Sequence, residues 1–231
     1  MIAPGDIISY IQMCEAEGAS LQRGMNFRLK GQSSVILMSL RRGAPYADRV
    51  EEGGRTLIYE GHDVPRQKDG PNPKEIDQQR FLPNGSPTQN GVFFDAAMRF
   101  KNGKASAEVV RVYEKIRSGI WAFDGLFELV DAWQEKAAGR SVFKFKLGVV
   151  TDTAVPKSEP QGDLPQNRLI PTEVKLEVWK RDGGKCVQCG SRDNLHFDHM
   201  IPFSKGGSSL LAENIQLLCA RHNLQKHDKI T

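Results

Sequence analysis

The apolar and polar positions along this chain follow two periods. Helical spacing of apolar residues predicts a helix over 6–17, with Asp6 as its N-cap, and a short helix over 92–100. Runs typical of strands lie at residues 35–38, 56–59, 108–113, 126–130 and 142–149. Strands outnumber helices and no βαβ rhythm appears. The pattern therefore predicts a mixed, mainly antiparallel α+β domain.

A change of composition divides the chain. Residues 152–170 hold three prolines and few β-branched or aromatic residues, which is typical of a linker. Beyond it, Thr172 is placed as the N-cap of a further helix. We therefore predict one domain over 1–151 and a smaller one over 171–231.

Composition narrows the function only a little. The chain has 231 residues, of which 39% are hydrophobic and 26% charged, so a disordered chain is excluded. No apolar run approaches the ~20 residues of a membrane span, and the N-terminus does not resemble a secretion signal. We expect a cytoplasmic protein with no membrane partner. A net charge of +4 is too small to mark a nucleic-acid binder by itself.

The cysteines cluster near the C-terminal end. Cys186 and Cys189 form one close pair, and Cys219 and His222 form another 29 residues later. Three thiolates and an imidazole can hold one tetrahedral Zn²⁺ and leave no open position, so this zinc would be structural. A DNA-binding C₂H₂ finger is disfavoured, because it needs ~12 residues between its ligand pairs. The remaining cysteine, Cys14, lies in an apolar helical pattern and is predicted to be a small core residue.

Three motifs surround these ligands: DHxxPxSxGG from Asp198, ENxQLLC from Glu213 and HNLxK from His222. Together with the first cysteine pair they resemble the HNH (ββα-metal) nucleases. That resemblance implies a small zinc-stabilised domain that hydrolyses phosphodiester bonds.

The resemblance also implies a role for each motif residue. His199 would be the general base, since a neutral imidazole can take a proton from water near pH 7. Asp198 and Asn223 would hold a catalytic Mg²⁺ or Mn²⁺, and Asn214 would orient the His199 ring. Lys226 would contact phosphate, with a solvated helix-face lysine as the alternative.

The first domain carries a second resemblance. Residues 120–136, IWAFDGLFELVDAWQEK, are similar to the YDGLY-V---W-EKG segment of SRA domains, with Phe123 in place of the usual Tyr. The segments over 34–48 and 54–61 resemble that family's SIVLSGGYEDD and YTG region. The resemblance spans most of residues 20–150. It implies a curved, barrel-like (PUA-like) sheet that binds a modified cytosine flipped out of the duplex.

The same resemblance assigns the base-binding residues. Tyr46 and Tyr59 would stack on the two faces of the base, and Asp48 would accept from the cytosine amine. Without the family match, Tyr46 is a turn residue and Tyr59 an ordinary strand aromatic. Glu60 replaces the usual Thr and either pairs with Arg49 or binds the base amine. Whether the base carries a 5-methyl, a 5-hydroxymethyl or a larger group stays open.

Taken together, these motifs predict a modification-dependent restriction endonuclease whose partner is double-stranded DNA containing modified cytosine. A flexible linker would let it cut at a variable distance from the flipped base. One HNH site cuts one strand, so a double-strand break needs a homodimer or two visits. The alternatives are a non-catalytic reader of modified DNA and an RNA-directed HNH nuclease.

Overall fold

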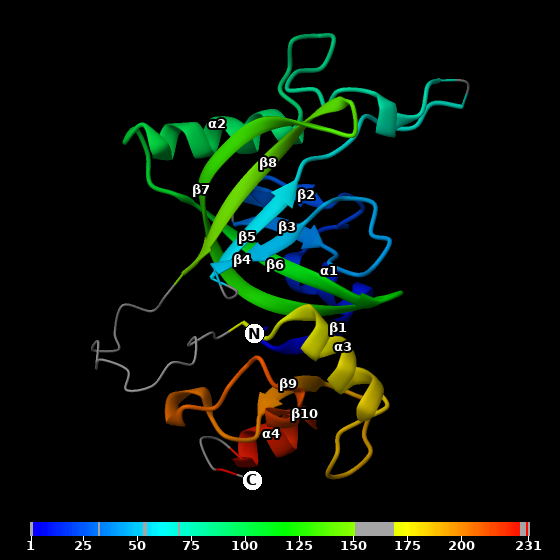
Figure 1. Cartoon of the computed structure of the whole chain (residues 1–231), viewed down its shortest axis with the longest axis vertical. Coiled ribbons are helices and arrows are strands. Elements are labelled where there is room, and N and C mark those ends of the chain that lie inside the picture. Colours follow the sequence, from blue (N-terminus) through cyan, green and yellow to red (C-terminus); the bar gives the residue numbers. More distant parts are fainter. Residues whose placement is uncertain are drawn as a thin grey trace.

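A computed structural model describes residues 2–31, 33–52, 55–68, 70–150, 169–226 and 230 of the chain. Residues 152–168 of the predicted linker lie outside the described residues. A curved sheet fills the upper part of the molecule, and a smaller unit of strands and helices formed by the C-terminal part of the chain lies below it (Figure 1). The predicted mixed α+β class is confirmed.

Within the described residues, ten strands and four α-helices are assigned. The strands are β1 (Asp6–Ser9), β2 (Met25–Asn26), β3 (Ser34–Met38), β4 (Arg49–Glu51), β5 (Thr56–Glu60), β6 (Glu108–Arg117), β7 (Ile120–Ala137), β8 (Arg140–Val149), β9 (Leu195–His199) and β10 (Ile215–Cys219). The helices are α1 (Tyr10–Glu17), α2 (Gln89–Lys101), α3 (Thr172–Arg181) and α4 (Ala220–Lys226). Short 3₁₀ turns lie at Leu29–Gly31, Pro73–Glu75, Phe203–Lys205 and Ala212–Asn214.

The strands join into one sheet built around the long β7. One path runs β10-β9-β1-β7-β6-β3-β2. From the C-terminal half of β7, on the edge opposite β6, the sheet also continues through β8, β5 and β4. The pairing is antiparallel except between β3 and β6, which run parallel. The prediction of a mainly antiparallel sheet is therefore confirmed.

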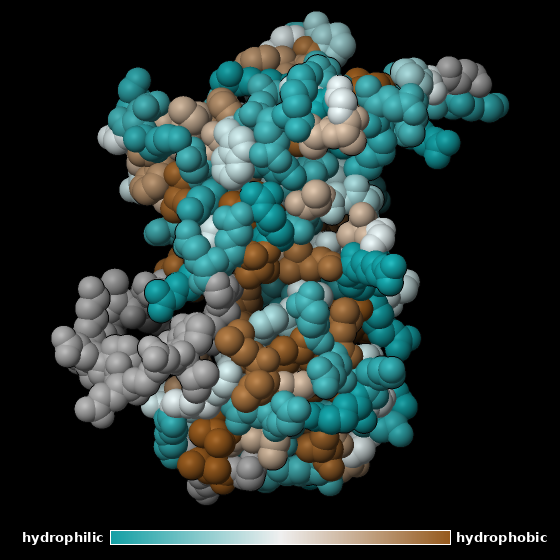
Figure 2. All heavy atoms as spheres, in the orientation of Figure 1, coloured by the Kyte–Doolittle hydropathy of each residue, from teal (hydrophilic) through white to brown (hydrophobic). Residues whose placement is uncertain are grey.

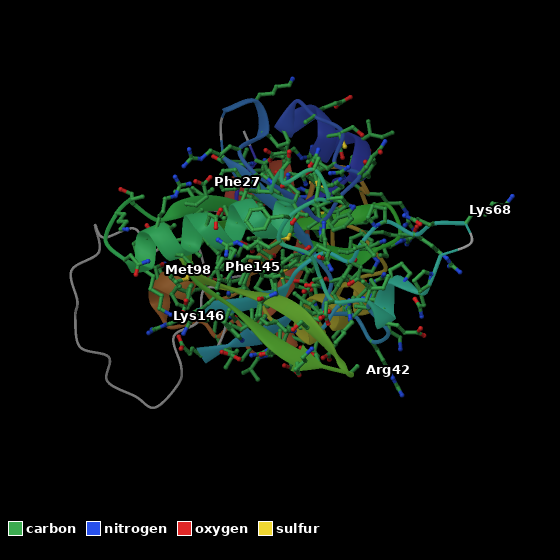
Figure 3. All side chains as sticks on the ribbon, turned by 90° about the horizontal axis from the view of Figure 1, so that it is seen from above. Phe27, Arg42, Lys68, Met98, Phe145 and Lys146 are labelled. Carbon is green, nitrogen blue, oxygen red and sulfur yellow. The ribbon has the colours of Figure 1, made fainter. Side chains whose placement is uncertain are left out.

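Helix α2 closes the concave face of the upper sheet (Figure 1). Phe93 of α2 packs edge-on against Phe27, with ring centroids 5.3 Å apart, and against Phe145 of β8 at 6.0 Å. Figure 3 shows Phe27 and Phe145 on opposite sides of this helix. Phe93 and Phe145 are fully buried, and each such side chain contributes roughly 1.5–3 kcal/mol. This core is the rigid support for the loops at the far end of the sheet.

Two predicted helix starts are wrong. Residues 6–9 form strand β1, because their backbone pairs with β7 on one side and β9 on the other. Helix α1 begins only after Ser9, which forms a capping box with Gln12. Helix α3 has Pro171 as its N-cap, and Thr172 is its first helical residue. No helix among the described residues is long and apolar enough to cross a membrane.

Candidate nuclease and base-binding sites

The four zinc-ligand candidates converge at the lower end of the molecule. The Nδ1 atom of His222 lies 3.3 Å from the Cys186 sulfur and 3.4 Å from the Cys219 sulfur. Cys189 and Cys219 have their sulfurs 3.8 Å apart, and all four ligand atoms fall within 4.8 Å of one another. A tetrahedron with Zn–S bonds of about 2.3 Å has S···S edges of about 3.8 Å. The cluster therefore fits one tetrahedral metal ion.

The surroundings of Cys186 favour its ligating form. Burial raises the pKa of this thiol, but hydrogen bonds from backbone N–H groups and from His222 lower it by more. The resulting pKa of Cys186 is about 6. The thiolate is the form that binds a metal.

The two strand residues of the DH motif, Asp198 and His199, lie side by side at the end of β9. Asp198 pairs with Gln216 across the strand ladder, and its Oδ2 atom accepts from the Gln216 side-chain amide at 3.2 Å. The Nε2 atom of His199 lies 2.8 Å from the Ser209 hydroxyl. Burial lowers the pKa of His199, so its ring is neutral near pH 7 and can accept a proton.

Asn214 holds the loop that follows His199, and no hydrogen bond between it and the imidazole is found. Its Oδ1 atom accepts from the backbone N–H of Ile201 at 2.8 Å, while its Nδ2 atom donates to the carbonyls of Ile201 and Ser208. The predicted contact with the His199 ring is made instead by Ser209. Asn214 therefore contacts the loop that carries Ser209, the residue beside the His199 ring.

Lys226 is buried, with 4% of its surface exposed. Its ammonium donates to the carbonyl of His199 at 2.6 Å and lies 3.1 Å from Oδ2 of Asp198. This placement differs from both a phosphate contact and a solvated lysine on a helix face. Lys226 therefore links Asp198, the predicted metal ligand, to the backbone of His199, the predicted general base.

The side chains around Asp198 include candidate ligands for a divalent cation. Asp198 and Asn223 offer a carboxylate and an amide carbonyl, the oxygen ligands that Mg²⁺ and Mn²⁺ prefer. A positive charge, the Lys226 ammonium, already lies beside the Asp198 carboxylate. Helix α4, which carries Asn223, packs against β9 and β10. The donor chemistry therefore suits a hard divalent ion.

A cavity of about 1740 Å³ opens in the upper part of the molecule. It exceeds the roughly 300–1,000 Å³ of ordinary small-molecule sites. Its walls come from the end of β3, the loop before β4, the end of β5 and the long segment 61–90. Among the residues that line it are Arg23, Gly24, Ser39, Arg41, Pro45, Tyr46, Asp48, Tyr59, His62, Arg66, Gln89 and Asn90.

Three aromatic rings line this cavity together. The Tyr46 and His62 rings are stacked, with centroids 6.2 Å apart and planes at 29°, and the Tyr59 ring is tilted at 6.5 Å from His62. The Tyr59 hydroxyl lies 3.3 Å from Nε2 of His62. Burial raises the pKa of Tyr46 and Tyr59 and lowers that of His62 to about 4. All three rings are therefore neutral at physiological pH.

Two glycines let the backbone approach these rings. A Cβ atom on Gly24 would lie 2.6 Å from the Tyr59 hydroxyl, and one on Gly61 would lie 2.6 Å from Oδ1 of Asn90. Both positions therefore exclude a side chain. Asn90 in turn accepts from the His62 N–H at 2.8 Å, which fixes that residue in the wall.

The two predicted carboxylates have different surroundings. Asp48 lines the cavity and accepts from the backbone N–H of Glu60 at 2.9 Å and of Ser39 at 3.3 Å, and burial raises its pKa to about 7. Glu60 is not among the lining residues. Its carboxylate pairs with Lys144 at 2.8 Å and lies 3.4 Å from Arg140.

Neither predicted contact of Glu60 is found. Arg49 pairs with Glu51 instead, at 2.7 Å, and Glu60 does not face the cavity. Lys144, in the predicted strand over 142–149, is fully buried beside Glu60 because β5 and β8 pair at that point.

Several cationic side chains lie in or near the wall of the cavity. Arg42 and Lys68 project from the same side of the molecule, away from its body (Figure 3). Their chain neighbours Arg41, Arg66 and Gln67 line the cavity. Side chains of this kind are suited to DNA phosphates.

Sequence reasoning missed His62 and Ser209. His62 lies three residues after Tyr59, in a segment of irregular backbone whose only signal is its length. Ser209 lies ten residues after the histidine that it contacts, in a loop rich in Gly and Ser. Only the folded loops bring either residue to its partner.

Comparison with known proteins supports the assignment of the lower unit. Residues 186–229 match the family model for the HNH endonuclease, so this part of the chain is an HNH endonuclease domain. A comparison with curated protein sequences returned no match.

Among solved structures, the chain is similar to the SUVH5 SRA domain in complex with hemi-methylated CG DNA. The identity is 26%, with 71% of this chain and 94% of that chain covered and a TM-score of 0.44. SUVH5 SRA bound to fully hydroxymethylated CG DNA gives 24% identity, the same coverage and a TM-score of 0.44. ScoMcrA, a type IV phosphorothioation-dependent restriction endonuclease, gives 14% identity, 100% and 58% coverage, and a TM-score of 0.43.

Proposed function

We propose that this chain is a modification-dependent DNA endonuclease that binds a flipped 5-methyl- or 5-hydroxymethylcytosine and cuts the DNA nearby. The observation that carries the proposal is the presence, in one chain, of an HNH domain and a cavity lined by neutral aromatic rings. In this proposal residues 1–151 recognise the base, 171–231 carry the nuclease, and 152–170 join them.

The cavity has the chemistry that a flipped base requires. Extrusion costs a few kcal/mol of lost stacking, and each base–aromatic contact can return about 1–3 kcal/mol. Tyr46, Tyr59 and the neutral His62 supply the ring faces, and the Lys74 ammonium lies 3.9 Å from the centroid of the Tyr46 ring. The half-buried Asp48 supplies an acceptor for the exocyclic amine of cytosine. Glu60 supports this wall from behind by accepting from the backbone N–H of Ala47.

At the nuclease site, His199 takes a proton from the attacking water, since its ring is neutral and partly buried. Ser209 holds the Nε2 side of that ring. Asp198 and Asn223 would hold Mg²⁺ or Mn²⁺, which when bound neutralises charge on the phosphate and the leaving oxygen. Lys226 fixes Asp198 and the His199 backbone relative to each other.

The Cys₃His cluster would hold Zn²⁺ as a structural ion. The nuclease part, residues 171–231, has only two short strands and two short α-helices, so a metal can supply much of its folding free energy. A homodimer on DNA would place one such site on each strand.

The test uses three duplexes that differ at one cytosine: 5-methylated, 5-hydroxymethylated and unmodified. A single-stranded RNA of the same sequence is the fourth substrate. With Mg²⁺ or Mn²⁺, wild-type protein should cut modified DNA and spare the other two, and H199A should bind modified DNA without cutting. Binding without any cleavage would favour a non-catalytic reader. Cleavage of the RNA alone would favour an RNA-directed nuclease.

A further inference from the structure

The first strand of the chain lies between the two parts of the molecule. Strand β1 pairs with β7 of the upper sheet through Ile7 and Ala122, and with β9 of the HNH domain through Ile7 and Leu195. Further along the same contact, the backbone N–H of Phe197 donates to the carbonyl of Gly5 at 3.0 Å. The HNH strands therefore continue the sheet that carries the cavity.

A side-chain pair reinforces that strand contact. The Nδ1 atom of His196 on β9 lies 2.6 Å from Oδ1 of Asp6 on β1. Asp6 also accepts from the backbone N–H of Ala3 at 2.8 Å. The carboxylate thus ties the N-terminal turn to the HNH domain.

Helix α3 contributes a buried cation to the same interface. The Lys175 ammonium lies 2.7 Å from Oε2 of Glu114 on β6 and 2.5 Å from Oδ1 of Asp124 on β7. The side chains of all three residues are at most 3% exposed. One residue of the C-terminal part is therefore held by two carboxylates of the upper sheet.

Apolar residues from both parts pack around these charges. One buried cluster includes Ile7, Ile116 and Ala122 from the upper sheet together with Val174, Val178 and Leu195 from the lower part. Figure 2 shows apolar residues gathering on this face where α3 meets the sheet above it. The charges of Lys175 and its two carboxylate partners are paired and buried only while this interface is closed. Removing one partner would leave a buried charge unpaired, which is costly.

We propose that Lys175, held by Glu114 and Asp124, fixes the HNH domain in one orientation relative to the base cavity, so that the docked interface sets where the DNA is cut. This inference rests on the proposed function. Lys175 is a positioning residue and takes no part in the chemistry. The length of the chain between the two domains then has no influence on the cleavage position.

A flexible tether makes the opposite prediction. Residues 152–168 would reach about 25 Å on average, or roughly seven base pairs at about 3.4 Å each. Cuts would then spread over that range, and a longer tether would spread them further.

The first experiment lengthens this segment. Eight Gly and Ser residues are inserted after Ser158, and cuts are mapped on an end-labelled duplex with a single 5-methylcytosine. We expect wild-type cuts confined to one or two adjacent phosphodiesters on each strand, with an unchanged map after the insertion. A map that broadens or shifts by several base pairs on insertion would overturn the proposal.

The second experiment opens the interface. K175A should spread the cuts over several additional phosphodiesters while the preference for modified DNA and the bound zinc stay at wild-type levels. The eight-residue insertion, silent in wild type, should broaden the map further in K175A. K180A, an exposed lysine on the same helix, is the matched control and should leave the map unchanged. Folded K175A protein with a wild-type map, with and without the insertion, would remove Lys175 from this role.

A third measurement separates docking from activity. Small-angle scattering of the full chain, with and without the insertion, should give the same interdomain distance if the domains are docked, even where no cleavage is detected. An increased distance after insertion would overturn the proposal. Absence of modification-dependent cleavage with an unchanged distance would instead count against the proposed function alone.

Discussion

The HNH site and the base cavity are built in opposite ways. The four metal-ligand candidates come from two short CxxC and CxxH turns, and the proposed catalytic pair, Asp198 and His199, comes from one strand. The cavity is assembled from loops distant in sequence, supported by a core of phenylalanines on β7, β8 and α2. A few residues close together in the sequence thus form the site in the HNH unit. In the upper domain, many contacts between distant segments form the cavity. A single substitution should therefore abolish cleavage at the HNH site, whereas a single substitution in the cavity should only weaken DNA binding.

The largest effect is expected from the metal cluster. C219S removes one of four ligands, so the HNH domain should lose its fold and cleavage should fall below detection, because structural Zn²⁺ contributes about 10–16 kcal/mol in small domains. Binding to modified DNA should persist. The measurements are zinc content, near-UV circular dichroism and cleavage. C14S, outside the cluster, is the control, and an active, zinc-free C219S protein would disprove the structural role.

The next effect concerns the proton acceptor. H199A should lower the cleavage rate by at least ~10²-fold, the usual range for loss of a general base, with binding near wild type. Single-turnover cleavage and a binding titration measure the two quantities. S209A leaves the imidazole present but loses the hydroxyl contact, so it should cost only a small part of the rate. A normal rate in H199A would mean that another group takes the proton.

In the cavity, Y46A should weaken binding to modified DNA by roughly 5- to 150-fold, as expected for the loss of one base–aromatic contact. Y46F keeps the ring face and should stay near wild type. Titrations at fixed salt with methylated and unmethylated duplexes give the ratio of affinities. If Y46A and Y59A leave this ratio unchanged, the base binds elsewhere.

The smallest effect is expected at the rim. R42A or K68A should weaken binding to every duplex alike and reduce the slope of log K against log salt by about 0.9 for each lost phosphate contact. The preference for modified DNA should not change. A change in that preference would place these residues at the base rather than at the backbone.

The contrast between the two sites also explains what could be predicted from the sequence. The Cys₃His cluster follows from ligand spacing alone, since two-residue turns restrict where the sulfur and nitrogen atoms can lie. The strands around 35–38 and 56–59 follow from runs of strand-forming residues and the one at 142–149 from alternation, and the structure confirms all three.

Residues whose partners lie far along the chain could not be predicted in the same way. Lys144 has the spacing of a surface lysine, and only the pairing of β5 with β8 shows that it is buried against Glu60. Asp6 has the sequence context of a helix cap, and only β9, at the other end of the chain, makes its segment a strand. Local patterns carry no record of such pairings.

The position of β1 has a consequence for the order of folding. Asp6 and His196 are separated by 190 residues, so the pairing of β1 with β9 is among the longest-range contacts of the fold. Contacts of this kind form late, because a long chain segment must be closed before they stabilise anything. On the ribosome, β9 is made about 190 residues after β1, so the outer edge of β1 lacks this neighbour until then. The HNH strands can therefore join the sheet that carries the cavity only after β9 has been translated.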